Sequence, residues 1–202
     1  MRATARALML AGVALLLGAA TFAVALGPGP SEALEGSVSI RGDPAEREAR
    51  RNRLFSALAA AQNEAAGRQV ANNIWLFWFE APDAEAARLM REALERRRML
   101  DLAAALKLLD ELIAHAPGWA EAWNQRATIR FLTDDYEGSL ADIERVLPLE
   151  PKHFGALSGR ALIFMRQGRT DEAEAALRRA VKINPFLAER ALLPPEPEGE
   201  DI

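Results

Sequence analysis

The sequence contains no cysteine and only two histidines, His115 and His153. Without cysteine the 202-residue chain can form no disulfide and carries no lipid-modified cysteine. It also has no glycine-rich phosphate loop and no nucleophile elbow. Glu111 and His115 are four residues apart and could supply two metal ligands, but no residue supplies a dependable third. We therefore expect no catalytic residues, no cofactor and no metal site.

An excess of positive charge is also missing. The chain has 25 basic and 29 acidic residues, and no long basic stripe with interleaved aromatic residues. Removal of residues 1–25 would take away two arginines and no acid, so that 23 basic residues would remain against 29 acidic ones. This balance argues against nucleic acid as the main partner.

The first 25 residues have the features of a secretory signal. Arg2 and Arg6 precede an apolar stretch, and Ala23-Val24-Ala25 has the small-residue pattern that signal peptidase recognises. A cleaved signal over 1–25 is the favoured interpretation. The alternative is an uncleaved anchor, because about twenty apolar residues are long enough to span a bilayer. In either case the rest of the chain would be exported, either into the periplasm or outside the cytoplasm on the inner membrane.

Three prolines mark a repeat of 34 residues: Pro117, Pro151 and Pro185. Each ends a unit with the same order of large and small residues, and a proline there stops a helix. Small residues let two antiparallel helices approach closely while larger residues fill the space beside them. They are Ala93, Ala127 and Ala161 at the eighth place of the units, and Ala105, Ser139 and Ala173 at the twentieth. Each unit is therefore predicted to be a helical hairpin.

The period resembles that of the tetratricopeptide repeat, whose pattern runs W-x2-L-G-x2-Y…A-x3-F…P. The matching residues are Leu89, Ala93, Ala105, Leu109 and Pro117 in unit 86–119; Trp123, Ala127, Ser139, Ile143 and Pro151 in unit 120–153; and Leu157, Ala161, Phe164, Ala173, Leu177 and Pro185 in unit 154–187. The resemblance implies an all-α, right-handed solenoid of stacked hairpins that holds another polypeptide.

The seventh place of each unit departs from this pattern. Where the family usually has leucine, the chain has Glu92, Arg126 and Arg160. A common bacterial variant has arginine there and aspartate sixteen residues later, as at Arg126 and Asp142. We predict that these two residues form a pair that ties the helices of the middle unit together. A surface pair of this kind would contribute on the order of 0–1 kcal/mol.

The same frame continues faintly before the first clear unit and predicts a degenerate opening helical pair over 47–85. Its second helix carries four aromatic residues within Trp75–Phe79 and is apolar on two faces. Such a helix must be covered. Burial between the opening helix and the next repeat is favoured, and the alternative is a partner or dimer patch containing Trp75 and Phe79.

The segments outside the hairpins are short. Residues 26–46 have little periodic apolar content and are predicted to be a flexible linker. Residues 188–193 leave room for a short capping helix over the last repeat. The proline-rich, acidic tail at 194–202 is predicted to be disordered.

The resemblance also implies a binding surface, because members of the family typically receive a peptide or helix on the concave side of the first helices. The residues at those places include Arg91, Asn124, Gln125, Thr128, Phe131, Ser158 and Arg166. Asparagine and glutamine can bond a peptide backbone, and arginine can grip a carboxylate. A mildly acidic or C-terminal peptide is therefore the predicted partner type.

Together these features predict a non-catalytic scaffold or adaptor in the periplasm or cell envelope. Its partner would be an unidentified protein or peptide, and it would meet a membrane only through an uncleaved N-terminal segment. One alternative is a membrane-anchored assembly subunit that self-associates through the aromatic helix 74–79. The other is an enzyme with an unrecognised site.

Overall fold

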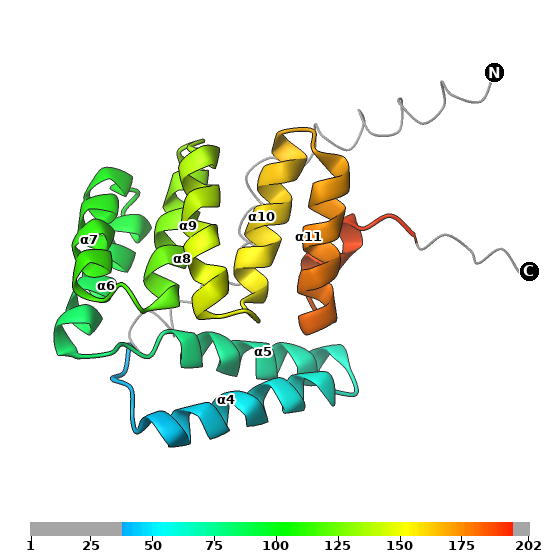
Figure 1. The fold of residues 1–202 in the computed structure, drawn as a ribbon, viewed down its shortest axis with the longest axis horizontal. Helices are drawn as coiled ribbons and strands as arrows, with labels where there is room; N and C mark the ends of the chain where they lie inside the picture. Colours follow the sequence, from blue (N-terminus) through cyan, green and yellow to red (C-terminus); the bar gives the residue numbers. More distant parts are fainter. Residues whose placement is uncertain (1–37, 196–202) are drawn as a thin grey trace, which may run out of the picture.

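The computed structural model describes residues 38–195, and within this range the fold is built from helices (Figure 1). The elements are α4 (Pro44–Ala59), α5 (Glu64–Trp78), α6 (Ala84–Arg98), α7 (Leu102–His115), α8 (Ala120–Leu132), α9 (Tyr136–Leu149), α10 (Phe154–Arg166), α11 (Thr170–Ile183) and the 3₁₀ helix η1 (Ala188–Leu192). A single bridge between Ile40 and Ala81 is the one strand-like pairing of the described residues. The predicted all-α class is confirmed.

Short polar side chains set where most of the helices begin. Asp43, Asn63, Asp83, Asp101 and Asp135 each accept a hydrogen bond from a backbone N–H in the first turn of the helix that follows. Such a cap satisfies a donor that the start of a helix leaves without an intrahelical partner. The starts of these helices are therefore set by local residues and can be predicted from the sequence.

Each 34-residue unit contains one antiparallel helical pair: α6 with α7, α8 with α9, and α10 with α11 (Figure 1). The turn inside each pair has a positive φ at the fifteenth place of the unit: 60° at Leu100, 60° at Asp134 and 72° at Gly168. Glycine adopts this backbone freely and aspartate tolerates it, whereas leucine is strained by it. The repeat thus imposes one turn geometry even where the residue does not suit it.

Arg126 joins the two helices of the middle unit and also reaches the unit before it. Its guanidinium donates to Asp142 at 2.6 and 3.0 Å, which confirms the predicted pair, and to Asp110 of α7 at 2.7 Å. Arg130 donates to Asp142 as well, at 2.9 Å. Because the Asp142 side chain is only 2% exposed, this is not the surface pair that the sequence suggested. A buried carboxylate depends on its partners far more strongly than an exposed one.

The opening pair is present, but it does not extend the stack. Figure 1 shows α4 and α5 side by side, lying across one end of the six helices α6–α11. The favoured prediction, burial of the aromatic helix between α4 and the next repeat, is confirmed for the burial and for Trp119 of unit 86–119, but the two later units contribute to the cover as well. The helix α5 is covered by α4 on one side and, on the other, by the turns that follow α7, α9 and α11 (Figure 1).

The turns that α5 crosses share one buried repeat position. Trp119, His153 and Leu187 are 34 residues apart in these turns and are 1%, 0% and 5% exposed. The indole Nε1 of Trp119 donates to the carbonyl of Trp78 at 2.8 Å, and the His153 ring stacks on the Trp78 ring at 3.9 Å. Beside Leu187, the ring of Phe186 lies so close to Gly67 that no side chain would fit there. The hairpin therefore braces all three units.

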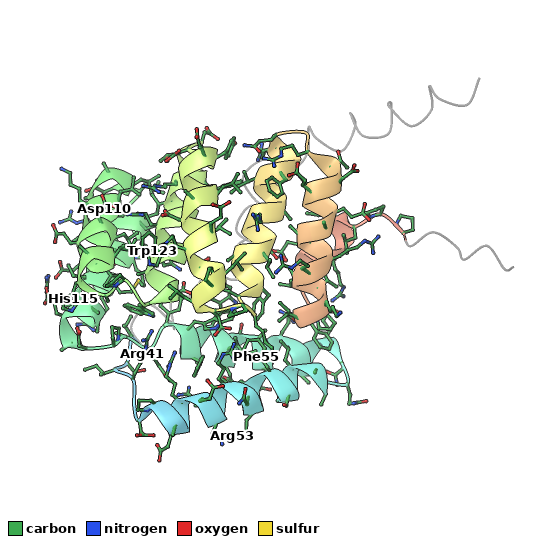
Figure 2. All side chains as sticks on the ribbon, in the orientation of Figure 1. Arg41, Arg53, Phe55, Asp110, His115 and Trp123 are labelled. Carbon is green, nitrogen blue, oxygen red and sulfur yellow. The ribbon has the colours of Figure 1, made fainter. Side chains whose placement is uncertain are left out.

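The helix α4 adds charged contacts to this brace. Arg51 donates to both carboxylate oxygens of Glu150, at 2.6 and 2.9 Å, across 99 residues of sequence. Arg47 and Arg50 both pair with Glu80, at the end of the hairpin. Figure 2 shows Phe55 on the side of α4 that faces the repeats, and this side chain is buried. The opening hairpin is thus attached by apolar and ionic contacts together.

The flanking segments differ slightly from prediction. The helix α4 begins at Pro44, inside the predicted linker 26–46, and the predicted cap at 188–193 is the 3₁₀ helix η1 against α11. The predicted signal at 1–25, and all but two residues of the tail 194–202, lie outside the described residues. Among residues 38–195 no helix has both the length and the apolar character needed to cross a membrane.

Candidate functional site

Two of the predicted groove residues, Asn124 and Gln125, belong to a buried polar network. Their side-chain amides donate to one carboxylate oxygen of Glu121, at 3.1 and 2.6 Å. The carbonyl oxygen of Gln125 accepts from Arg97 of α6 at 2.7 Å. Asn124 and Gln125 are only 6% and 4% exposed. These hydrogen bonds connect the first and second units.

The same carboxylate continues the network into the turn before α10. The second oxygen of Glu121 lies 3.1 Å from Nε2 of His153, and both side chains are fully buried. Nδ1 of His153 accepts from the backbone N–H of Ala156, so in the neutral ring the proton is on Nε2 and is donated to Glu121. The face of the ring stacks on Trp78. His153 therefore caps α10 and joins the second unit to α5.

The remaining predicted groove residues fall into two groups. Thr128, Phe131 and Ser158 are 7%, 4% and 1% exposed, and the buried hydroxyl of Ser158 has no hydrogen-bond partner among the residues that the structure describes. Arg91 on α6 and Arg166 at the end of α10 are exposed. The structure thus brings the predicted residues to successive first helices, with exposed arginines at the two ends. The five buried residues are closed to a partner in this conformation, so only the two arginines are open to contact, and the role of the predicted set in binding stays a prediction.

The alternative partner patch, which contains Trp75 and Phe79, is buried. Trp75 is 2% exposed and Phe79 is 1% exposed. The Trp75 ring makes edge contacts with Trp78, His153 and Phe154, the last two of which precede or begin α10. Trp75 therefore cannot contact a partner unless α5 first leaves the repeats, and we withdraw the patch as a binding site.

A surface that the sequence did not predict lies at the free end of the stack. A depression of about 930 Å³ lies over α6 and α7. Its lining includes Arg91, Leu94, Met99, Lys107 and Leu108. Met99 and Leu100, which follow α6, are 59% and 81% exposed. The signal in the sequence was the leucine at the fifteenth place of the unit, where the later units have aspartate and glycine.

The pair Glu111 and His115 does not lead to a metal site in the described chain. Nε2 of His115 lies 2.9 and 3.1 Å from the two carboxylate oxygens of Asp83, the residue that caps α6. The backbone N–H of Ala86 and then His115 lower the pKa of Asp83. Across residues 38–195 no group of three or more histidine or acidic side chains could hold a metal ion. This histidine thus links α7 to the start of α6.

Comparison with known proteins identifies relatives over most of the chain. A family model described as tetratricopeptide repeat matches residues 133–188. A TPR repeat-containing protein of Rhizobium etli is 37% identical over 169 residues, which cover 81% of each chain. Tetratricopeptide repeat protein 36 of Xenopus tropicalis is 31% identical over 113 residues. The PEX5-related protein of Homo sapiens is 26% identical over 144 residues.

The overlap with the last two relatives is partial. The match covers 54% of this chain and 56% of the Xenopus protein, and 69% of this chain but only 22% of the human one. These two alignments therefore concern the repeats and say little about the rest of either relative.

Proposed function

The chain belongs to the tetratricopeptide-repeat family, and we propose that it is a non-catalytic adaptor that holds a partner polypeptide on the inner face of its first helices. Proteins of this family act in protein–protein interaction. The observation that carries the proposal is the layer of first helices: α8 contacts α10 directly, and Gln125 of α8 bonds Arg97 of α6. One continuous surface of this kind is suited to an extended segment or a helix.

Charge supports a partner with carboxylates. Arg91 and Arg166 are exposed cations on the first and last of these helices. Arginine can bind a carboxylate through two parallel hydrogen bonds. We propose an acidic segment or a C-terminus as the bound group, in contact first with these two arginines.

Site-specific photo-cross-linking in intact cells tests this function. A benzoylphenylalanine that replaces Arg166 should give a discrete adduct with one polypeptide. The same residue at Arg53 is the matched control, because Arg53 is an exposed arginine on α4 and points away from the repeats (Figure 2). Identical adducts from both positions, or none from position 166, would contradict binding at the inner face.

We also propose that the protein acts outside the cytoplasm, in the periplasm or on the outer side of the inner membrane. The support is the basic and apolar leader with Ala23-Val24-Ala25 at its end. Intact-mass measurement of the protein from the envelope fraction tests it. A chain that begins at Leu26 is expected, whereas a full-length mass in that fraction would indicate an anchor. Recovery of the full-length chain from the cytoplasm would contradict export.

A further inference from the structure

We propose that the depression over α6 and α7, which Met99 lines and which Leu100 follows in the chain, docks an acidic amphipathic segment of a protein partner. The inference rests on the proposed adaptor function and adds a second surface, which shares Arg91 with the end of the inner face. The site lies at the free end of the stack, apart from the Asn124 network.

The position of the depression in the repeat explains why it is open. At the seventh place of the later units, Arg126 bonds Asp110 of α7, and Arg160 lies 3.8 Å from Glu144 of α9. The corresponding face of the middle and last units is therefore covered by the second helix of the unit before. The corresponding residue of the first unit is Glu92, which is exposed and lines the depression. In a regular stack, α5 would cover this face of the first unit. In this protein α5 crosses the ends of the helices instead, so the face stays open.

Leu100 is unfavourable at its position in two independent ways. Its φ of 60° brings the Cβ atom close to the backbone, and leucine has no polar group to compensate by a local hydrogen bond; 81% of its surface is also exposed. The equivalent turns carry Asp134 and Gly168, which suit this backbone and are polar or small. Met99 beside it is also exposed. A strained, exposed leucine next to a large depression indicates a contact with something outside the chain.

The charges around the apolar floor select the partner. Leu94, Ala104 and Leu108 form the floor. Of the acids at the rim, Glu92 is paired with Arg88 at 2.7 Å and Glu95 with Arg98 at 2.6 Å. Glu111 lines the depression as well, and within the described part of the chain it is an acid without such a pair.

Two cations at this rim remain available. Among residues 38–195, the side chains of Arg91 and Lys107 make neither a hydrogen bond nor an ion pair. Two unpaired cations against one unpaired acid favour an acidic segment, whose apolar side would cover Leu108, Met99 and Leu100. Contacts of both kinds are expected for an amphipathic partner.

Binding of two synthetic peptides to the full chain tests the proposal by fluorescence anisotropy. Each peptide is an amphipathic helix of about four turns with a leucine stripe; one has glutamate at the other positions and one has lysine. We expect the acidic peptide to bind at least about tenfold more tightly, and added salt to reduce the difference. Equal binding of both peptides, or binding of neither, would overturn the proposal.

Two variants give the test its specificity. Leu100→Gly should raise the melting temperature by about 2–4 °C, because it relieves the strained turn. The same variant should bind the acidic peptide about tenfold more weakly than wild type. Lys107→Glu should reduce binding of the acidic peptide and increase binding of the basic one. Leu149→Ala is the matched control, since Leu149 is 43% exposed and lies on α9, and its binding should equal that of wild type.

Several results would count against the site. Unchanged binding by Leu100→Gly would show that the exposed leucine is not the anchor. Self-association of the wild type that Leu100→Gly abolishes would make a second copy the occupant and would replace the proposal. If the peptides fail to bind as expected but position 166 gives a discrete adduct, the docking site is wrong and the adaptor function is kept. If position 166 gives no adduct either, the adaptor function is contradicted as well.

Discussion

At the scale of single residues, the fold depends on carboxylates that lie out of solvent and are held by arginines. Asp142 accepts from both Arg126 and Arg130, and Glu150 accepts two bonds from Arg51. The first set ties helices within and between units, and the second ties α4 to the turn before α10. Removal of one member leaves the other charge poorly solvated, which costs much more than loss of a surface pair.

Asp142→Ala should therefore destabilise the protein by about 3 kcal/mol, because two guanidinium groups lose their shared acceptor. Urea unfolding followed by circular dichroism measures the change. Asp171→Ala is the control, since Asp171 is exposed at the start of α11 and should matter by less than about 0.5 kcal/mol. A loss of similar size in both variants would show that Asp142 does not depend on buried pairing.

The pair of Arg51 and Glu150 should make stability depend on pH. Burial raises the pKa of Glu150, but the hydrogen bonds and charge of Arg51 outweigh it, and the folded-state pKa is below the ordinary value. The contribution is thus fully present above the unfolded pKa of about 4.3 and is lost as the pH falls through the folded pKa. Glu150→Gln should therefore be less stable than wild type at neutral pH.

Urea midpoints of the wild type and Glu150→Gln across the acid range measure this dependence. The two midpoints should converge as the pH falls below the ordinary pKa of glutamate. A constant difference between them at every pH would mean that the charge of Glu150 is not responsible.

At the scale of elements, two glycines mark how closely α5 approaches the repeats. A methyl group at Gly155 of α10 would lie 2.4 Å from the Trp75 ring, and one at Gly67 of α5 would lie 2.1 Å from the Phe186 ring. Each contact joins α5 to the start of α10 or to the turn after α11. The crossing of α5 over the units is therefore built on positions that allow only glycine.

Gly155→Ala tests this crossing, because the crossing predicts a loss of stability where an ordinary helix position would show a gain. In a helix without the contact, alanine would stabilise by roughly 0.5–1 kcal/mol relative to glycine. The overlap with Trp75 should instead destabilise the protein by about 1–3 kcal/mol. Thermal unfolding measures the difference, and Trp75→Phe in the same chain should recover part of the loss. A more stable Gly155→Ala variant would place α5 elsewhere.

Most elements could be predicted from the sequence because their signals are local. Small residues at fixed places, prolines at the ends and aspartate caps identify the three hairpins, and Arg126 with Asp142 follows from their spacing. The path of α5 could not be predicted, because the same apolar faces fit either a regular stack or a crossing. Trp119, His153 and Leu187 gave the missed signal: three bulky residues at one turn position, of which α5 contacts the first two and Phe186, the neighbour of the third.

The candidate site was predicted only in part. The repeat register correctly brought Asn124, Gln125 and Thr128 to the first helix of the middle unit, but register alone does not show that Glu121 is a buried hub for two of them. The depression over α6 and α7 is open because α5 does not stack against the first unit. The path of α5 cannot be deduced from the residues of one repeat alone.

At the scale of the whole molecule, the crossing hairpin changes how the repeats depend on one another. A plain solenoid is stabilised by contacts between neighbours alone. Here α5 touches turns that belong to three units, through Trp119, His153 and Phe186. The same arrangement leaves the first unit without a cover, so the brace and the open depression are two consequences of one path of the chain.

Cross-linking of introduced cysteine pairs tests this path most directly, because the chain has no cysteine of its own. The pair Arg51→Cys and Glu150→Cys joins positions whose side chains now touch. The pair Leu76→Cys and Glu92→Cys corresponds, one unit earlier, to the contact between Asp110 and Arg126. A short bis-maleimide reagent on the native protein, read by intact mass, should link the first pair and leave the second unlinked. Linkage of the second pair without the first would mean that α5 stacks on the first unit and fills the depression, which would contradict the crossing hairpin and the docking site together.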